Sequence, residues 1–151
     1  MGRERILFLC VHNSARSQMA AAWLRSLAAD RFEVDSVGIA RRDALHPLAI
    51  RVMAERGIHI GGQVPKLALG LMRDRWDHVI TVSDEAYERC PPFPTTTSRL
   101  HWPFPDPTVD AGSDDERIAV FRMVRDSIEA RVRAWLGGQG VRLPATTSSF
   151  L

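Results

Sequence analysis

The chain has 151 residues, of which 45% are hydrophobic and 25% charged, the composition of an ordinary globular domain. Its net charge of +2 is too small to indicate nucleic acid or a membrane surface as a partner. No apolar run approaches the roughly 18 residues of a membrane span, and the run that begins at Ile6 is too short for a signal peptide. With only Cys10 and Cys90, the chain lacks a secreted disulfide framework, so we expect a cytoplasmic protein.

The first half of the chain predicts a βαβ unit. Residues 5–10 form an unbroken apolar run, which is typical of a central parallel strand buried on both faces. Apolar residues at spacings of three and four predict a helix over 14–29, and residues 32–37 predict a second strand. Strand, helix and strand in this order favour a right-handed parallel unit.

The second half completes an α/β domain. Pro47 and Gly57 are a natural start and stop for a helix, and Ser113 and Glu116 form a capping box at the start of a helix that reaches Leu136. Further elements are expected at 67–72 (short helix), 78–83 (strand), 84–90 (short helix) and 99–102 (strand).

The predicted fold class is therefore one three-layer α/β domain with a four-stranded parallel sheet and helices on both faces. We expect the domain to span 1–138 and a flexible tail to span 139–151.

The junction between the first strand and the first helix carries the strongest chemical signal. Cys10 ends the strand, and Arg16 follows after a loop of five residues: Val11, His12, Asn13, Ser14 and Ala15. A helix N-terminus and a nearby guanidinium favour a thiolate, and inward-pointing loop amides can bind an oxyanion. Ser14 and Ser17 can donate hydrogen bonds to the sulfur or to loop carbonyls. The alternative, a buried strand cysteine beside a solvated arginine, fits this position less well.

Residues 10–20, Cys-Val-His-Asn-Ser-Ala-Arg-Ser-Gln-Met-Ala, resemble the signature of arsenate reductases on the low-molecular-weight tyrosine phosphatase fold. Residues 35–38, 81–94 and 101–107 resemble further segments of that family, so the likeness covers 5–138 in the right order. Gln18 stands where the phosphatases usually have proline, and Thr108 where they favour tyrosine. Both departures favour the reductase.

The resemblance implies a role for each site residue. Cys10 would be the nucleophile on arsenic, Arg16 the oxyanion clamp, and Ser17 the residue that steadies the thiolate. Asp106 would be the general acid that protonates the departing oxygen. The alternative for Asp106 is a turn residue before Pro107, a common use of Asp-Pro.

Cys90 is the second thiol, and the sequence leaves its role open. Thioredoxin-linked members of the family place two cysteines seven residues apart in this segment, whereas this chain has Ser83 at the first position. Either Cys90 attacks the adduct on Cys10, or an external low-molecular-weight thiol does. Direct attack would require residues 83–94 to move, because a disulfide needs Cα atoms within about 7 Å. Otherwise Cys90 is a small apolar residue that closes a helix.

The remaining polar residues indicate no metal requirement. Asn13 and Ser36 match the potassium site of some family members, but residues 63–66 lack the acidic ligand, so we expect no required metal. His12 can either contact the anion or face solvent. Arg41 and Arg42 are expected as a solvated pair near the mouth of the site, and His101 and Trp102 as packing residues.

The resemblance implies thiol-dependent reduction of arsenate to arsenite, which detoxifies arsenic, with phosphate or sulfate as substrate analogues. No bound cofactor is expected. The external reductant would be thioredoxin, or glutathione with glutaredoxin, or another small thiol, and we expect a monomer. The second hypothesis is a phosphatase that hydrolyses phosphate monoesters through a phosphocysteine. A non-catalytic oxyanion-binding protein is a third hypothesis, disfavoured because binding needs neither nucleophile nor acid.

Overall fold

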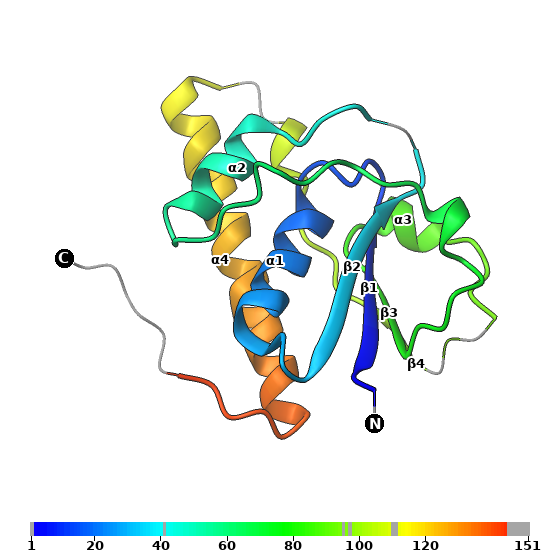
Figure 1. Cartoon of the computed structure of the whole chain (residues 1–151). Coiled ribbons are helices and arrows are strands. Elements are labelled where there is room, and N and C mark those ends of the chain that lie inside the picture. The colour runs from blue at the N-terminus through cyan, green and yellow to red at the C-terminus, as the bar shows by residue number, and fades with distance from the viewer. Residues whose placement is uncertain (1, 41, 95, 97, 110–111, 145–151) are drawn as a thin grey trace.

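The computed structural model describes residues 2–40, 42–94, 96, 98–109 and 112–144. Its centre is a parallel four-stranded sheet in the order β2-β1-β3-β4 (Figure 1). The strands are β1 (Glu4–Cys10), β2 (Phe32–Gly38), β3 (His78–Thr81) and β4 (Ser98–His101). The predicted sheet is thus confirmed.

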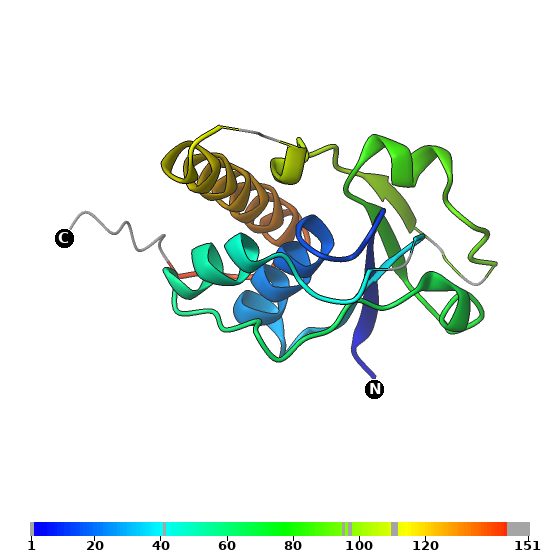
Figure 2. The same cartoon turned by 90° about the horizontal axis from the view of Figure 1, so that it is seen from above.

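Helices cover both faces of this sheet, as expected for a three-layer domain. The view from above shows α1 (Arg16–Ala28), α2 (Pro47–Ala54) and α4 (Asp114–Gly138) on one side (Figure 2). The short helix α3 (Asp84–Glu88) and the 3-10 turn η1 (Ala68–Gly70) lie on the other side. A second 3-10 turn, η2 (Pro107–Val109), contacts α4.

Strand β1 is buried on both faces, as its unbroken apolar run predicts. Ile6, Phe8 and Cys10 belong to the core beneath α1 and α4, whereas Leu7 and Leu9 belong to the core on the α3 side. Parallel strands on both sides complete its backbone hydrogen bonding, and Cys10 ends the strand opposite Gly38 of β2. The thiol therefore projects from the most constrained strand of the molecule.

Two helices near the cysteines, α1 and α3, differ from their predicted bounds. α1 begins at Arg16 rather than Ser14, with Ala15 as an N-cap that offers no side-chain cap. The amides at its start therefore stay available to an anion. α3 ends at Glu88, so Cys90 lies beyond the helix. Ser83 caps α3, because its Oγ accepts from the backbone N–H of Ala86 at 3.1 Å.

The other predicted elements hold with smaller changes. β3 ends at Thr81, β4 begins at Ser98, and the expected helix over 67–72 is the 3-10 turn η1. The capping box at Ser113 and Glu116 is present, and α4 continues to Gly138. Val141 and Leu143 then pack against the core. Residues 145–151 of the predicted tail lie outside the described residues.

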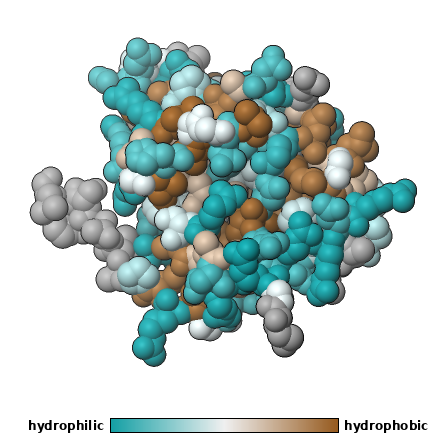
Figure 3. Space-filling model, viewed as in Figure 1, coloured by the Kyte–Doolittle hydropathy of each residue, from teal (hydrophilic) through white to brown (hydrophobic). Residues whose placement is uncertain are grey.

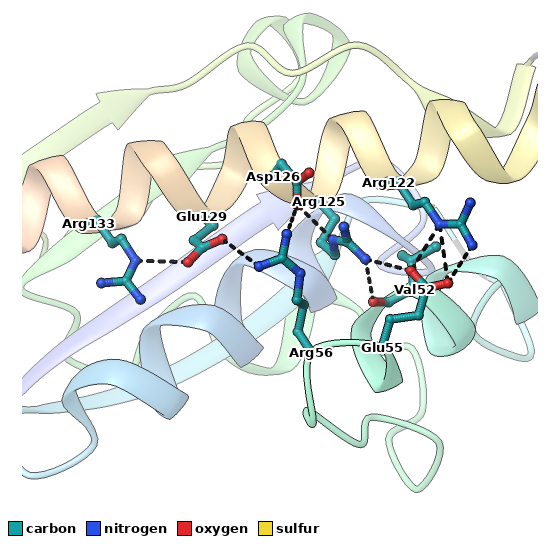
Figure 4. Close-up of polar contacts among 8 residues, drawn as sticks. All are labelled: Val52, Glu55, Arg56, Arg122, Arg125, Asp126, Glu129 and Arg133. Atoms are coloured by element: carbon teal, nitrogen blue, oxygen red, sulfur yellow. Dashed lines mark hydrogen bonds and ion pairs between the residues drawn. The ribbon is translucent and has the colours of Figure 1, made fainter. Parts of the chain in front are cut away.

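A network of charged side chains joins the C-terminal end of α2 to α4 and so fixes the position of α2. Arg125 is only 5% exposed and donates to the carbonyl of Val52 at 3.0 Å and to Glu55 at 2.7 Å. The hydrogen bond from Arg122, assisted by Arg125 against the effect of burial, holds the pKa of Glu55 below its ordinary value. The residues of this network are Val52, Glu55, Arg56, Arg122, Arg125, Asp126, Glu129 and Arg133 (Figure 4).

The face shown in Figure 3 carries hydrophilic and hydrophobic residues side by side, and one group of hydrophobic residues lies over the part that Figure 1 draws in green. The exposed apolar side chains of that part include Leu67 and Leu69, the latter 82% exposed. Among the described residues, no helix is both long and apolar enough to cross a membrane.

Candidate active site

The loop after β1 curls back over the sulfur of Cys10. Asn13 adopts a left-handed backbone conformation with φ of 55°, which asparagine tolerates better than most residues. This turn directs the N–H of Asn13 to Cys10 Sγ at 3.2 Å. Ser17, in the first turn of α1, places its Oγ 2.7 Å from the same sulfur. The two contacts hold a buried thiol in one orientation.

The amide of Asn13 gives these contacts a direction. Its Oδ1 accepts from the backbone N–H of Lys66 at 2.8 Å and from Gln18 Nε2 at 2.9 Å. Because a backbone N–H can only donate, Oδ1 is fixed as the acceptor, and Nδ2 donates to Ser17 Oγ at 2.7 Å. The hydroxyl hydrogen of Ser17 is then free to be donated to Cys10 Sγ. A thiolate at Cys10 can only accept hydrogen bonds, so the arrangement suits a thiolate.

The loop is also held from outside by the segment after β2. The carbonyl of Val11 accepts from the N–H groups of Ile39 and Ala40, both at 2.8 Å. Gly38 allows this approach, because a Cβ on it would lie 2.7 Å from the oxygen of Val11 and 2.8 Å from the carbonyl carbon of His12. Gly38 is thus required by the shape of the catalytic loop and not by a turn.

Arg16 reaches from α1 to the loop before η2. Its guanidinium donates to the carbonyl of Phe104 at 3.0 Å and lies 3.6 Å from a carboxylate oxygen of Asp106. Phe104 itself is anchored to the end of the sheet, since its N–H donates to the carbonyl of Val82 at 3.3 Å. The arrangement brings the predicted clamp and the predicted acid together.

Thr108 sets the state of the Asp106 carboxyl group. Its backbone N–H and its hydroxyl both donate to Asp106 Oδ1, at 2.9 and 2.7 Å. Burial alone would raise the pKa of Asp106, but the bonds from Thr108 and the charge of Arg16 outweigh it and leave that pKa below its ordinary value. Asp106 is therefore ionised at neutral pH when the site is empty.

His12 is a neutral imidazole bound to Arg42. A guanidinium has no acceptor atom, so the contact of 3.2 Å between Arg42 and His12 Nδ1 makes Nδ1 the acceptor and places the ring hydrogen on Nε2. Burial and then the charge of Arg42 lower the pKa of His12. Arg42 is exposed, as expected of a solvated residue, although it also contacts His12. Arg41 lies outside the described residues.

Cys90 has surroundings of another kind. It is half-buried beside the apolar cluster on the α3 side, and its thiol donates to the carbonyl of Pro91 at 3.4 Å. Burial raises the pKa of the Cys90 thiol, and the charge of Arg99 only partly opposes this. The preceding helix is fastened to β4, because His101 Nε2 lies 2.9 Å from Asp84 and Tyr87 stacks on the His101 ring. Both cysteines are free thiols.

The region that resembles a potassium site is occupied by protein groups. Asn13 Oδ1 already accepts from Gln18 and Lys66, and the ammonium group of Lys66 lies 3.0 Å from Asp35. Among the described residues no group of three or more His, Cys, Asp and Glu side chains could hold a metal ion. That no metal is required stays a prediction.

The sequence pattern missed several residues that shape the site. Gly38 and Thr108 were not singled out for these contacts, and the carbonyl of Phe104 has no sequence signal at all. Gln18 offered one, because it is a polar residue at a buried position of a helix and is only 3% exposed. Trp102 packs against Phe8 with ring centroids 5.8 Å apart, in line with its predicted packing role.

The chain is similar to known proteins in sequence and in fold. The family described as low molecular weight phosphotyrosine protein phosphatase matches residues 5–145. An arsenate reductase of Halalkalibacterium halodurans is 38% identical over 135 residues, which are 89% of this chain and 96% of that protein.

Two solved structures extend the comparison. An arsenate reductase in the phosphate binding state has a TM-score of 0.75 at 30% identity and covers 89% of this chain and 98% of its own. A thioredoxin-dependent arsenate reductase of Corynebacterium glutamicum has a TM-score of 0.68 at 27% identity, over 90% of this chain and 61% of its own. The chain therefore belongs to the low molecular weight phosphotyrosine protein phosphatase family.

Proposed function

We propose that this protein is an arsenate reductase that uses Cys10 as nucleophile, Arg16 as oxyanion clamp and Asp106 as general acid. The observation that carries the proposal is the chain of hydrogen bonds from Gln18 through Asn13 and Ser17 to Cys10 Sγ. Gln18 is one of the two positions at which the chain departs from the phosphatases, and here its side chain is bonded to Asn13, which is bonded to Ser17 beside the nucleophile. The relative of Halalkalibacterium halodurans, itself named an arsenate reductase, supports the proposal.

In the first step the arsenate anion is held by Arg16 and by the amides of residues 11–15. The thiolate of Cys10 attacks arsenic and forms a sulfur–arsenic bond, while one arsenic–oxygen bond breaks. Asp106 protonates the departing hydroxyl group of arsenate, which leaves as water. Asp106 must first gain a proton, and arsenate binding favours this because the anion neutralises Arg16 and adds negative charge beside the carboxylate.

In the second step a second thiolate attacks Cys10 Sγ. A disulfide forms, the sulfur–arsenic bond breaks, and its electron pair stays on arsenic, which leaves as arsenite. The second thiol is Cys90 or an external small thiol. Burial and its bond to Pro91 keep Cys90 a thiol. Cys90 packs against the core cluster on the α3 side, whereas Cys10 belongs to the core beneath α1 and α4, so an attack by Cys90 would require the segment after α3 to move.

A dithiol then reduces a disulfide between Cys10 and Cys90, or one further small thiol reduces a mixed disulfide on Cys10. Thioredoxin fits a disulfide between Cys10 and Cys90, and glutathione with glutaredoxin fits a mixed disulfide on Cys10. The name of the Corynebacterium glutamicum relative supports thioredoxin. We expect a monomer in the cytoplasm, where thiols are kept reduced.

The proposal is tested by arsenate-dependent NADPH consumption, measured once with a thioredoxin system and once with glutathione and glutaredoxin. Turnover in at least one system is the expected result. An aryl phosphate assay on the same preparation tests the second candidate function, phosphate monoester hydrolysis through a phosphocysteine. Fast ester hydrolysis without arsenate turnover in either system would contradict the proposal and show that the protein is a phosphatase.

The phosphatase candidate has a specific basis. The family is named for phosphotyrosine hydrolysis, and phosphate has the tetrahedral geometry and charge of arsenate. In ester hydrolysis the same nucleophile attacks phosphorus, the same clamp binds the phosphate oxygens, and the same acid protonates the ester oxygen that leaves. We therefore expect weak phosphatase activity beside arsenate reduction.

A further inference from the structure

Helix α3 packs only lightly against the sheet. Of its five residues, only Ala86 is buried. A cavity of about 570 Å³ is lined by Thr81 and His101 from strands β3 and β4, and by Tyr87 and Cys90 from the helix and the residues that follow it. A helix this short is not stable by itself, so its position depends on side-chain contacts with the strands.

One histidine at the end of β4 makes these contacts. His101 Nε2 lies 2.9 Å from a carboxylate oxygen of Asp84 in the first turn of α3, and the ring stacks on Tyr87 with ring centroids 4.5 Å apart. Because a carboxylate can only accept, Nε2 carries a hydrogen and donates it to Asp84. Nδ1 of the same ring lies 2.7 Å from Thr81 Oγ1 in β3. We call Thr81, Asp84, Tyr87 and His101 the His101 cluster.

The His101 cluster lies at the same end of the sheet as the nucleophile. Thr81 of β3 is the register partner of Leu9, the residue before Cys10, and His101 of β4 is the register partner of Thr81. Adjacent strands are about 4.8 Å apart, so the backbone of His101 lies about 10 Å from that of Leu9. Helix α3 is therefore fastened two strand spacings from the strand that ends in Cys10.

The chain is anchored on both sides of the segment that contains Cys90. Val82 N–H donates to the carbonyl of Leu9 at 2.9 Å, and Phe93 is fully buried in the same core cluster as Leu9. Cys90 is three residues from Phe93, a span of about 10 Å when extended. Unwinding of α3 between these anchors therefore lets Cys90 move over a distance similar to that between His101 and Leu9.

We propose that His101 is a positioning residue for the second step, which holds α3 closed and keeps Cys90 away from Cys10 until the His101 cluster opens. The inference rests on the proposed function and deepens it. After opening, Cys90 loses its proton to solvent and its thiolate attacks Cys10 Sγ of the arsenic adduct. The sulfur–sulfur bond forms, the sulfur–arsenic bond breaks with its electron pair on arsenic, and arsenite leaves. His101 acts on Cys90 only through the position of α3.

The strength of the His101 cluster suits a contact that opens. The Asp84 side chain is 80% exposed, so solvent screens its bond to His101. In the closed state burial raises the pKa of the Cys90 thiol, which donates to the carbonyl of Pro91. Opening exposes this thiol to water and removes the cause of the raised pKa. The movement that brings Cys90 towards Cys10 therefore also favours its thiolate.

The first test measures the rate at which iodoacetamide labels Cys90 in the Cys10→Ser background, followed by mass spectrometry. His101→Phe keeps a ring for Tyr87 and removes both hydrogen bonds, so labelling should become roughly tenfold faster. His101→Gln keeps a donor and an acceptor and should restore slow labelling. His59→Phe, which changes an exposed histidine after α2, is the matched control. An unchanged labelling rate in His101→Phe would overturn the inference.

Amide exchange separates local opening from a loss of overall stability. Tyr87 N–H donates to the carbonyl of Ser83 at 3.0 Å within α3. In NMR exchange measurements on the full chain, His101→Phe should accelerate exchange of this amide roughly tenfold, whereas the amide of Val82, bonded to Leu9, should keep its rate. Equal acceleration of both amides would count against the inference, because His101 would then stabilise the whole fold.

The last test follows the disulfide between Cys10 and Cys90 by mass spectrometry, without external thiol. The disulfide is induced either by arsenate or by the oxidant diamide, and His101→Phe should speed its formation with both. If diamide produces this disulfide but arsenate is reduced with no reductant, the inference stands and the proposed function fails. If an external thiol supports arsenate reduction but neither reagent produces the disulfide, the function stands and the inference fails.

Discussion

The two thiols of this protein are held in opposite ways. The sulfur of Cys10 accepts a hydrogen bond from a backbone amide and lies 2.7 Å from a serine hydroxyl that can donate to it, at the end of the central strand. The sulfur of Cys90 donates its hydrogen to a carbonyl, beyond the end of a five-residue helix. Hydrogen bonds donated to a sulfur favour the thiolate, which is the nucleophilic form. A sulfur that donates its own hydrogen is in the thiol form. The difference lies in the surrounding donors, since both cysteines are largely removed from solvent.

The largest effect is expected from exchanging each sulfur for oxygen. Cys10→Ser should abolish arsenate reduction and aryl phosphate hydrolysis, a loss of at least about a thousandfold, because both reactions start at this atom. Cys90→Ser should leave phosphate ester hydrolysis intact. Its arsenate turnover separates the two routes for the second step: full turnover would show that Cys90 is structural and that an external thiol releases arsenite.

The second largest effect on activity is expected at Gly38, which lies against the loop after Cys10. Gly38→Ala places a methyl group against Val11 and His12 and so displaces the loop. We expect kcat/KM to fall roughly a hundredfold from misplaced donors and the free energy of unfolding to fall by about 1–3 kcal/mol.

Gly70→Ala is the control for Gly38→Ala, because a Cβ on Gly70 would meet no heavy atom within 4 Å. Its free energy of unfolding should change by less than about 0.5 kcal/mol. Equal behaviour of the two variants in kinetics and chemical denaturation would show that the loop does not depend on this approach.

A shift of the pH profile is expected from Thr108→Val, which removes the hydroxyl that donates to Asp106 at 2.7 Å. The pKa of Asp106 should rise, because a hydrogen bond to its charged form is lost. Since the acid must be protonated to act, the basic limb of the kcat/KM profile should move to higher pH, and Thr108→Ser should restore it.

Thr108→Val also has an effect on stability. A carboxyl group with a lowered pKa stabilises the fold above its unfolded pKa, and this contribution is lost as the pH falls through its folded pKa. The variant should therefore lose less stability than the parent protein on acidification. An unchanged kinetic profile and an unchanged acid unfolding curve would together exclude Thr108 as the residue that sets the state of Asp106.

The smallest effect is expected at Ser83, on the Cys90 side. Ser83→Ala removes the cap of α3 at a cost of about 1 kcal/mol, whereas Ser83→Asp keeps an oxygen for the same amide. If Cys90 must leave its place to reach Cys10, easier opening should raise Cys90-dependent arsenite release by up to about fivefold. A destabilised helix with an unchanged release rate would show that α3 does not open during the reaction.

The sequence carried enough information for the order and type of the elements. The unbroken apolar run of β1 and the capping box at Ser113 act through local physics, and both predictions are confirmed. The apolar spacing predicts a start of α1 at Ser14, two residues before its observed start at Arg16. Residues 11–15 form the loop that curls over Cys10, so the helix can begin only after them. This requirement comes from the tertiary structure and has no signal in the local sequence.

The residues of the site were predictable from the signature, but their partners were not. Arg16 bonds to a carbonyl 88 positions away, and Asn13 accepts from an amide 53 positions away. Backbone groups have no identity in a sequence, so the roles of Phe104 and Lys66 emerge only when the sheet is assembled. The same holds for Gly38, whose neighbour across the sheet is Cys10 itself.

The cross-links around the catalytic loop have a consequence for local unfolding. Val11 accepts from the amides of Ile39 and Ala40, Gly38 N–H donates to Lys66 at 2.7 Å, and Lys66 N–H donates to Asn13. Segments without regular secondary structure are thereby tied to the central strand. In hydrogen–deuterium exchange their amides should be protected to a similar degree and should exchange together, as one cooperative unit. The loop that holds the nucleophile would then unfold locally only together with β2, the edge strand beside it, and at the same frequency.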